Sequence, residues 1–191
     1  MRRSLCILIV GLGSAGVTAA PVTWTDGNGH TYDLVITQSP MTWAQAKADA
    51  ESRGGYLATI TSRNENAFIS NALDVVNVDE AWATNSQAWL GPWLGGFQPD
   101  GSPEPGGGWQ WVTGEVWDFT WWHSGEPSNT GTGHENALHF FGYQSEGRRT
   151  VWNDTDGDAT LLPSYIIEYD VPAPAGLAVV VGGLACTRRR R

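Results

Sequence analysis

Two helix-start signals lie in the first third of this sequence, and a series of short strand-like segments follows them. Thr42 with Gln45 and Ser62 with Glu65 both match the capping-box pattern, in which a hydroxyl residue precedes the helix and Glu or Gln stands three residues later. Gly54-Gly55 is expected to end the first of the two helices. Early helices followed by many strands predict an α+β fold rather than a helical bundle.

The segments after residue 85 alternate between apolar runs and loops. We expect strands over residues 88–94, 109–113, 137–143, 150–152 and 161–169, a short extended segment over 56–60 and an aromatic extended stretch over 116–122. Gly95 to Gly108 is rich in glycine and proline, which predicts a loop. Five tryptophans lie close together in sequence, and most of them are expected in the core, because large aromatic side chains dominate the energetics of burial. They are Trp109, Trp111, Trp117, Trp121 and Trp122. The alternative for one or two of them is stacking on a sugar ring.

The first 20 residues have the pattern of a secretory signal peptide. Arg2 and Arg3 precede an apolar run over residues 5–17, and small residues follow at a position suited to cleavage. The run is shorter than the ~20 residues that a membrane-spanning helix needs. Cleavage is therefore favoured over a permanent membrane anchor.

Residues 171–191 have a pattern of their own. Pro172-Ala173-Pro174 precedes an apolar stretch, and Arg188 to Arg191 end the chain. This pattern resembles the bacterial PEP-CTERM sorting signal, although Ala173 stands where that family usually has glutamate. The resemblance implies transient retention in the membrane, cleavage near the proline motif, and a final location at the cell envelope or outside the cell. A simple tail anchor is the alternative.

The body between these ends, residues 21–170, is acidic and lacks cysteine. It holds five of the eleven basic residues and all twenty acidic ones, hence a net charge of −15. Such a charge argues against electrostatic binding of nucleic acid and suits an exported protein that binds divalent cations, although a solvated acidic surface gives the same count. Cys6 and Cys186 both lie in the ends, so the body relies on its core or on a bound ion for stability.

Seven short motifs occur in order along the body. They are Trp43-Ala44-Gln45-Ala46, Gly54-Gly55-Tyr56-Leu57-Ala58-Thr59-Ile60, Asn64-Glu65-Asn66-Ala67-Phe68-Ile69, Trp89-Leu90-Gly91 or Trp93-Leu94-Gly95-Gly96, Glu126-Pro127-Ser128, Trp152-Asn153-Asp154 and Tyr165-Ile166-Ile167-Glu168. Together they resemble the C-type lectin-like domain over nearly all of residues 22–170. The resemblance implies two helices, two small antiparallel sheets and a long loop region that holds calcium and ligand.

The same resemblance shows where this chain departs from the family. Members usually carry a disulfide from the first helix to the last strand, and Ala50 and Ile167 occupy those positions here. Ala137 stands at one end of a second usual disulfide. Loss of each bridge removes a constraint typically worth ~2–4 kcal/mol, part of which bound calcium would restore through linkage.

The resemblance also assigns a calcium site that binds sugar. The predicted metal ligands are Glu126, Asn129, Glu135, Asn153 and Asp154, and the predicted carbohydrate-binding residues are these five together with Ser128. Carboxylate and amide oxygens suit calcium, which takes six to eight oxygen ligands, and two neighbouring sugar hydroxyls would complete its shell.

Three local features bear on whether this site is intact. Ser128 stands where the family has an asparagine ligand, and Asn129 would replace it if the loop shifts by one residue. His134 is the expected insertion between Glu126 and Glu135. The bond before Pro127 is expected to be cis by the same resemblance.

Other constellations are weaker. Gln98-Pro99-Asp100 matches a galactose-type motif of the family but stands in a different loop, whereas the Glu126-Pro127 pair favours mannose-type ligands. Asp156 and Asp158 belong to an EF-hand-like run without its closing glutamate, which favours a solvated turn over an accessory calcium site. His139 alternates with apolar neighbours and is interpreted as a strand-face residue.

We therefore expect an exported, non-enzymatic protein that binds carbohydrate in a calcium-dependent manner at the cell envelope or in the extracellular matrix. The alternative is a structural or adhesive surface protein that binds protein partners without sugar or calcium. A glycosidase in which Glu126 and Glu135 act as a pair is disfavoured, because no apolar cleft that raises one pKa is evident in the sequence.

Overall fold

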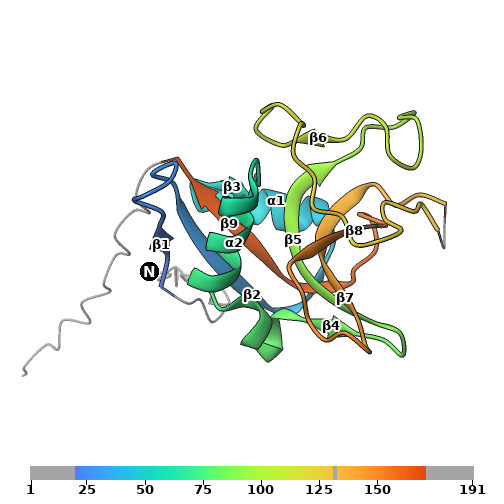
Figure 1. Ribbon diagram of the computed structural model, residues 1–191, viewed down its shortest axis with the longest axis horizontal. Coiled ribbons are helices and arrows are strands. Elements are labelled where there is room, and N and C mark those ends of the chain that lie inside the picture. The colour runs from blue at the N-terminus through green and yellow to red at the C-terminus, as the bar shows by residue number, and fades with distance from the viewer. Residues whose placement is uncertain (1–19, 131–132, 171–191) are drawn as a thin grey trace, which may run out of the picture.

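The computed structural model describes residues 20–130 and 133–170, in which two helices pack against a mixed β-sheet (Figure 1). The α+β class predicted from the sequence is confirmed. The predicted sorting signal, both cysteines and all of the predicted signal peptide except Ala20 lie outside the described residues. Within the described part, no helix has both the length and the apolar character needed to cross a membrane.

The two helices begin where the capping patterns predict. Helix α1 (Trp43–Ser52) has a complete capping box. The backbone N–H of Gln45 donates to the Thr42 hydroxyl at 3.2 Å, and the side-chain oxygen of Gln45 accepts the backbone N–H of Thr42 at 3.0 Å. Helix α2 (Arg63–Ala72) has only half of the predicted box. The Ser62 hydroxyl accepts from the Glu65 N–H, but the Glu65 carboxylate is buried and bonds to Thr61 instead.

In the part of the chain that the structure describes, nine strands form one connected sheet. They are β1 (Val22–Thr23), β2 (Thr31–Met41), β3 (Tyr56–Leu57), β4 (Ala83–Thr84), β5 (Ala88–Phe97), β6 (Gln110–Trp111), β7 (Ala137–Tyr143), β8 (Val151–Thr155) and β9 (Leu162–Tyr169), with two short 3-10 helices at Val75–Asn77 and Asp79–Ala81. The main order is β1-β2-β9-β5-β7-β8, and β3, β4 and β6 pair at its sides. The expectation of two separate small sheets is corrected, because β5 and β9 pair in parallel at Trp93 and Tyr165.

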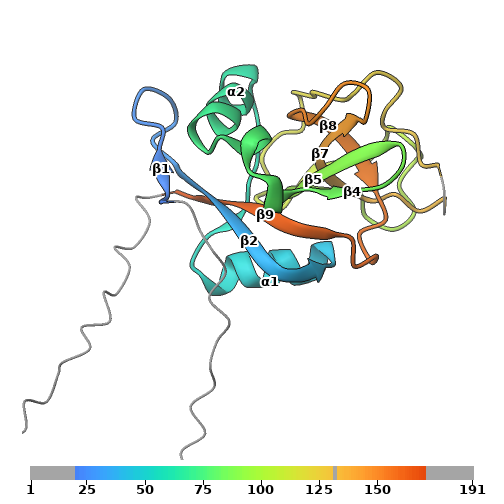
Figure 2. The same cartoon turned by 90° about the horizontal axis from the view of Figure 1, so that it is seen from below.

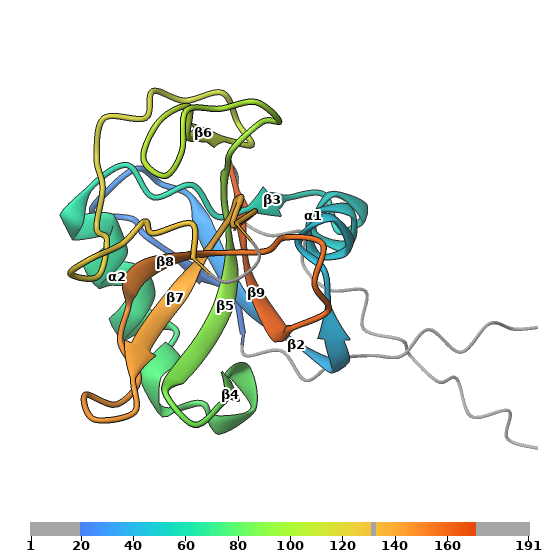
Figure 3. The ribbon, with the colours of Figure 1, turned by 90° about the vertical axis from the view of Figure 1, so that its right-hand side faces the viewer.

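The elements surround this sheet on several sides. Figure 2 shows α1 and α2 on opposite sides of the β2–β9 pair. Figure 3 shows β5, β7 and β8 side by side, with β6 and the long loop after it at the top of the view. The ends of β7 and β8 therefore lie next to the loop region that carries most of the predicted ligands.

The observed strands differ from the predicted ones at several points. Strand β7 matches its prediction, whereas β5 extends three residues further and the predicted strand at 109–113 shrinks to β6. The aromatic stretch 116–122 is not a strand; Trp122 makes one isolated bridge to Trp152, and several rings of the stretch pack against the core instead. Strand β2 has no counterpart in the sequence predictions.

The core has two clusters that meet at the sheet. Trp152 is fully buried in the first cluster, where its ring contacts Trp111 and Phe119 edge to face. This anchors β8, so that the two residues after Trp152 have a fixed position. The second cluster contains Ala50, Ala137 and Ile167, all at most 1% exposed. Apolar packing thus occupies the positions where the family resemblance implies disulfides.

Candidate functional site

The two segments predicted to share a site meet at Asp154. This side chain is fully buried at the end of β8. Its carboxylate accepts the backbone N–H of Ser128 at 3.0 Å and the backbone N–H of Asn129 at 2.8 Å. The bond before Pro127 is cis, as the resemblance implies. Asp154 therefore holds the loop against the sheet at the position of the Glu-Pro-Ser motif.

Asn129 closes the next part of this loop. Its backbone has a positive φ of 47°, which asparagine tolerates better than most residues. Its side-chain oxygen accepts the backbone N–H of Glu135 at 2.9 Å. Asn129 therefore donates its backbone N–H to Asp154 at the end of β8, and its side chain accepts from Glu135. These two hydrogen bonds connect Asp154, Asn129 and Glu135.

Three carboxylates gather around these contacts. Burial and the charge of Asp154 raise the pKa of Glu126, and burial together with Asp154 and Glu126 raises the pKa of Glu135 to about 7. One oxygen of Glu126 and one of Glu135, Oε2 in each, are buried without a hydrogen-bond partner among the described residues. Such orphaned oxygens are costly unless a donor or a cation satisfies them.

The carboxylate and amide oxygens at this site suit a hard cation such as calcium. The carboxylates alone do not provide enough ligands for it. Among residues 20–130 and 133–170, no group of three or more Asp, Glu, His or Cys side chains is arranged to hold a metal alone. Amide oxygens from Asn129 and Asn153, as well as hydroxyl groups of a ligand, would have to complete the shell of an ion that needs six to eight oxygens.

His139 orients the amide of Asn153. Burial lowers the pKa of His139 to about 4, so the ring is neutral. Its Nδ1 lies 2.6 Å from the Phe140 carbonyl and must donate there, which leaves Nε2 as an acceptor 3.1 Å from Asn153 Nδ2. The Asp154 carbonyl accepts from the same Nδ2 at 2.5 Å. Both contacts engage the amide nitrogen, so the amide oxygen of Asn153 is the atom left for a ligand.

This role for His139 was not predicted. Strand alternation indicated only that the residue lies on one face of a strand. The register of β7 against β8, which pairs His139 with Asn153, supplies the missing information. No local sequence signal carries that register.

A cavity of about 440 Å³ opens beside these residues. Four of the predicted site residues line it, namely Glu126, Ser128, Glu135 and Asn153. Asn129 and Asp154 are not among the lining residues, but the contacts described above connect them to Ser128 and Glu135. All six predicted residues therefore belong to one connected arrangement. A larger hollow of about 530 Å³ between β2 and α1 contains none of them.

The weaker candidates from the sequence analysis make local contacts of their own. Gln98 is buried, and its side-chain nitrogen donates to the Pro105 and Gly107 carbonyls, so the galactose-type motif braces the loop that follows β5. Its backbone N–H donates to the carbonyl of Asn136, the residue after Glu135. His134 is exposed and its Nε2 lies 3.2 Å from the side-chain amide of Asn136. Asp156 accepts the Asp158 N–H in an exposed turn.

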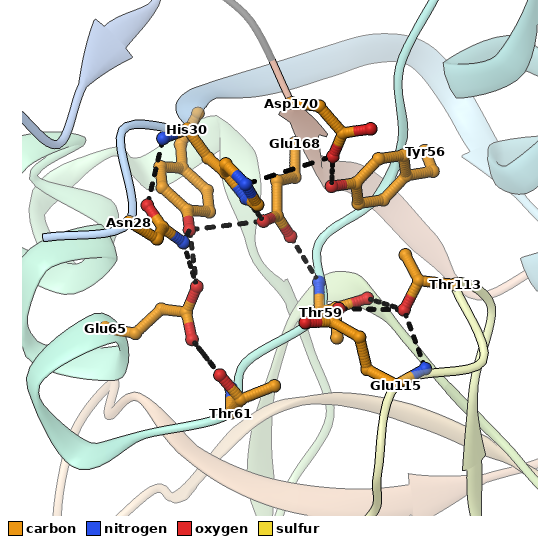
Figure 4. Close-up of polar contacts among 11 residues, drawn as sticks. Asn28, His30, Tyr56, Thr59, Thr61, Glu65, Thr113, Glu115, Glu168 and Asp170 are labelled. Carbon is orange, nitrogen blue, oxygen red and sulfur yellow. Dashed lines mark hydrogen bonds and ion pairs between the residues drawn. The ribbon is translucent and has the colours of Figure 1, made fainter.

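A second polar cluster, which the sequence did not predict, joins β2, β9 and α2, and Figure 4 shows its contacts. Glu65 on α2 and Glu168 on β9 are at most 2% exposed. The Tyr32 hydroxyl donates to Glu65 at 2.5 Å, and His30 Nδ1 lies 2.5 Å from Glu168. Asn28 and the backbone N–H groups of Thr59 and Thr61 donate to the same two carboxylates. These donors satisfy the buried charges and tie α2 to the sheet.

Comparison with known proteins identifies relatives of this chain. The family model described as the lectin C-type domain matches residues 39–161. Lectin BRA-3 from Megabalanus rosa is 30% identical over 127 residues, which cover 66% of this chain and 67% of that protein.

Solved structures share the fold. The mouse scavenger receptor C-type lectin carbohydrate-recognition domain superposes with a TM-score of 0.53 at 21% identity, over 80% of this chain and 96% of that one. The C-type lectin domain of murine dendritic cell inhibitory receptor 2, solved in complex with an N-glycan, gives 0.51 at 18% identity, over 73% of this chain and 89% of that one.

Proposed function

This chain belongs to the C-type lectin domain family, a non-enzymatic family, and we propose that it binds carbohydrate through a calcium ion held between the loop 126–135 and the end of β8. The observation that carries the proposal is the contact of the Asp154 carboxylate with the backbone of Ser128 and Asn129. That contact joins the two segments whose oxygen atoms the proposal requires in one place.

Each residue has a distinct part in the proposed site. Glu126 and Glu135 supply carboxylate oxygens, and in each residue Oε2 has no hydrogen-bond partner among the described residues. Asn153 supplies its amide oxygen, because His139 engages only the amide nitrogen. Asn129 and Asp154 hold the loop in place through their mutual hydrogen bond. Asn129 also offers its amide oxygen to the ion, and Asp154 offers its negatively charged carboxylate. The ion, when bound, would accept two neighbouring sugar hydroxyls as ligands. Ser128 contributes its backbone N–H to Asp154, and its hydroxyl lies 3.1 Å from that of Thr130.

The proposal is tested by calorimetric titration of the protein with calcium, followed by a glycan array with calcium and with EDTA. We expect calcium binding and calcium-dependent glycan signals that Glu135→Gln and Asn153→Ala remove. Asp100→Asn, which changes an exposed acid of the galactose-type motif outside the cavity, serves as the matched control and retains both signals. Absence of calcium-dependent glycan binding in the unsubstituted protein contradicts the proposal.

One observation favours a second function. The carboxylates do not by themselves form a metal-binding group, and Ser128 replaces a usual amide ligand. A surface protein that binds protein partners through this fold would need neither calcium nor sugar. In that case partner capture survives EDTA as well as the combined change Asn153→Ala with Asp154→Ala.

We also propose that the protein is exported and acts at the cell envelope or in the extracellular matrix of a bacterium. The support is the predicted signal peptide and the sorting-signal pattern, both of which lie outside the described residues apart from Ala20. Detection of the protein in cell fractions, with and without residues 171–191, tests this location.

A further inference from the structure

The cavity beside the proposed ion site continues well beyond it. Its lining includes Asn85, Gln87 and Tyr143 as well as Glu126, Glu135 and Asn153. The strand register places Tyr143 opposite Ala88, and it places Asn153 opposite His139, further along β7. Asn85, Gln87 and Tyr143 therefore form what we call the far end of the cavity. Its volume of about 440 Å³ lies within the roughly 300–1,000 Å³ typical of small-molecule sites. The far end contains none of the predicted site residues, so its chemistry is a separate observation.

The middle of the cavity is apolar. Leu90 and Phe141 are paired across β5 and β7, and Leu161 joins them in the lining. A sugar ring presents carbon-bound hydrogens on its faces and hydroxyl groups at its rim. An apolar lining between two polar ends therefore suits a chain of sugar units that passes from one end to the other.

Tyr143 forms the aromatic wall of the far end. Its side chain is 39% exposed, one of two large hydrophobic side chains exposed to this degree in the described residues. The ring is held edge to face by His123, with centroids 4.9 Å apart, and by Phe141 at 5.1 Å. The His123 carbonyl accepts the N–H of Glu126 at 3.0 Å. His123 therefore contacts both the Tyr143 ring and the backbone of Glu126, which fixes the position of the far end relative to the ion end.

Two amides accompany this ring. The Asn85 side-chain oxygen accepts the N–H groups of Gln87 and Ala88, both at 2.8 Å, which leaves its amide nitrogen for a ligand. The Gln87 carbonyl accepts the Gln144 N–H at 2.8 Å, so the β4–β5 turn lies against Tyr143. Neutral amide donors and acceptors next to an exposed ring suit uncharged hydroxyl groups.

We propose that this far end is a second sugar subsite, so that the ligand is an oligosaccharide or polysaccharide chain of neutral sugars rather than a single terminal sugar. The ion site binds one unit, and Tyr143 with Asn85 and Gln87 binds another. The inference rests on the proposed function, since the first unit is held by the ion.

The experiment compares affinity for short and long ligands in calcium. The probes are mannose with its di- and tetrasaccharide, and N-acetylglucosamine with its matched oligomers, all measured by calorimetry. We expect the tetrasaccharide of the recognised series to bind at least about tenfold more tightly than the monosaccharide, which corresponds to ~1.4 kcal/mol. Tyr143→Ala and Gln87→Ala are each expected to reduce this ratio about fivefold.

Two matched variants control for the fold. Tyr143→Phe keeps the ring and is expected to keep the ratio, and Val116→Ala truncates an exposed side chain outside the cavity. Because Gln87 is exposed, its substitution tests the subsite even if Tyr143→Ala unfolds the protein. Calcium-dependent monosaccharide binding with no gain for longer chains overturns the subsite and leaves the proposed function intact. Failure of every probe to bind in calcium contradicts both.

Discussion

The imidazole of His139 sets the orientation of the Asn153 amide, because its Nε2 accepts from the amide nitrogen at 3.1 Å while its Nδ1 donates to the Phe140 carbonyl. His139 is fully buried and contacts Trp93 and Phe141 edge to face. Packing on several sides thus fixes the ring, and the ring fixes which atom of Asn153 is free. A residue outside the predicted ligand set therefore controls one of the ligands.

His139→Leu is expected to weaken calcium binding about tenfold. The leucine fills the space but accepts no hydrogen bond, so the amide of Asn153 is free to rotate and its oxygen is no longer held in place. His139→Gln offers an acceptor again and is expected to recover part of the affinity. Calorimetry with calcium gives the affinities, and near-UV circular dichroism in EDTA shows whether the core is intact. Equal affinities for the histidine and leucine proteins, with intact cores, contradict this role.

Asp154→Ala is expected to destabilise the protein even without calcium. The variant leaves the partly buried backbone N–H groups of Ser128 and Asn129 without an acceptor. A fully buried group left unsatisfied costs about 1–3 kcal/mol, so the loss here is expected at the lower end of that range. Asn153→Ala removes a ligand but no loop contact of this kind, so it is expected to affect calcium binding more than stability. Urea unfolding in EDTA separates the two effects. A loss of stability in Asn153→Ala as large as that in Asp154→Ala disagrees with this assignment.

The free energy of unfolding is expected to fall as the pH rises from 6 to 8 in EDTA. Burial raises the pKa of Glu168 to about 7, and although burial lowers that of His30, the contact with Glu168 raises it overall. A group whose pKa is raised on folding stabilises the protein below its unfolded pKa, and this contribution is lost as the pH rises through the folded value. The loss is expected to be about 1 kcal/mol.

The variant Glu168→Gln distinguishes the contribution of this cluster from that of other groups whose pKa is also raised on folding. Burial also raises the pKa of Glu135 to about 7, so the unsubstituted protein reports both sites. The glutamine keeps the shape and cannot titrate, so its stability is expected to depend less on pH over this range. Chemical denaturation at pH 6 and pH 8 measures the difference. An unchanged dependence in Glu168→Gln assigns the effect to groups other than this cluster.

Local signals were enough for the helices but not for all strands. The capping boxes and Gly54 act within a few residues, so both helices could be predicted from sequence. Strand β2 pairs with β9, far along the chain, and its register shifts between Ile36 and Met41, which hides any simple alternation. The aromatic stretch 116–122 has the composition of a strand, but its rings pack into the core, and burial overrode strand propensity.

The site shows the same difference between local sequence signals and contacts made by distant segments. Four of the six predicted residues came from two motifs that are each contiguous in sequence, and Asn129 and Glu135 came from the polar loop that follows the first motif. The structure joins the two segments through Asp154. The residues that act across strands, His139 and Tyr143, depend on the register of β7 with its neighbours β8 and β5. The pair Glu65 and Glu168 depends on Tyr32 of β2, whose hydroxyl lies within hydrogen-bond distance of both carboxylates. Such partners follow from tertiary pairing, which a single sequence does not contain.

The double variant Ala50→Cys with Ile167→Cys is expected to form a disulfide and stabilise the protein. Both side chains are fully buried in one cluster, and Gly55 links the two, since its N–H donates to the Ala50 carbonyl and a Cβ on it would touch Ile167. A bridge between α1 and β9 closes a long loop in the unfolded chain, which is worth about 2–4 kcal/mol. Urea unfolding with and without a reductant measures this gain. Two free thiols after oxidation, or a bridged protein that is less stable than the original, would show that apolar packing at these positions has moved the backbones out of disulfide geometry.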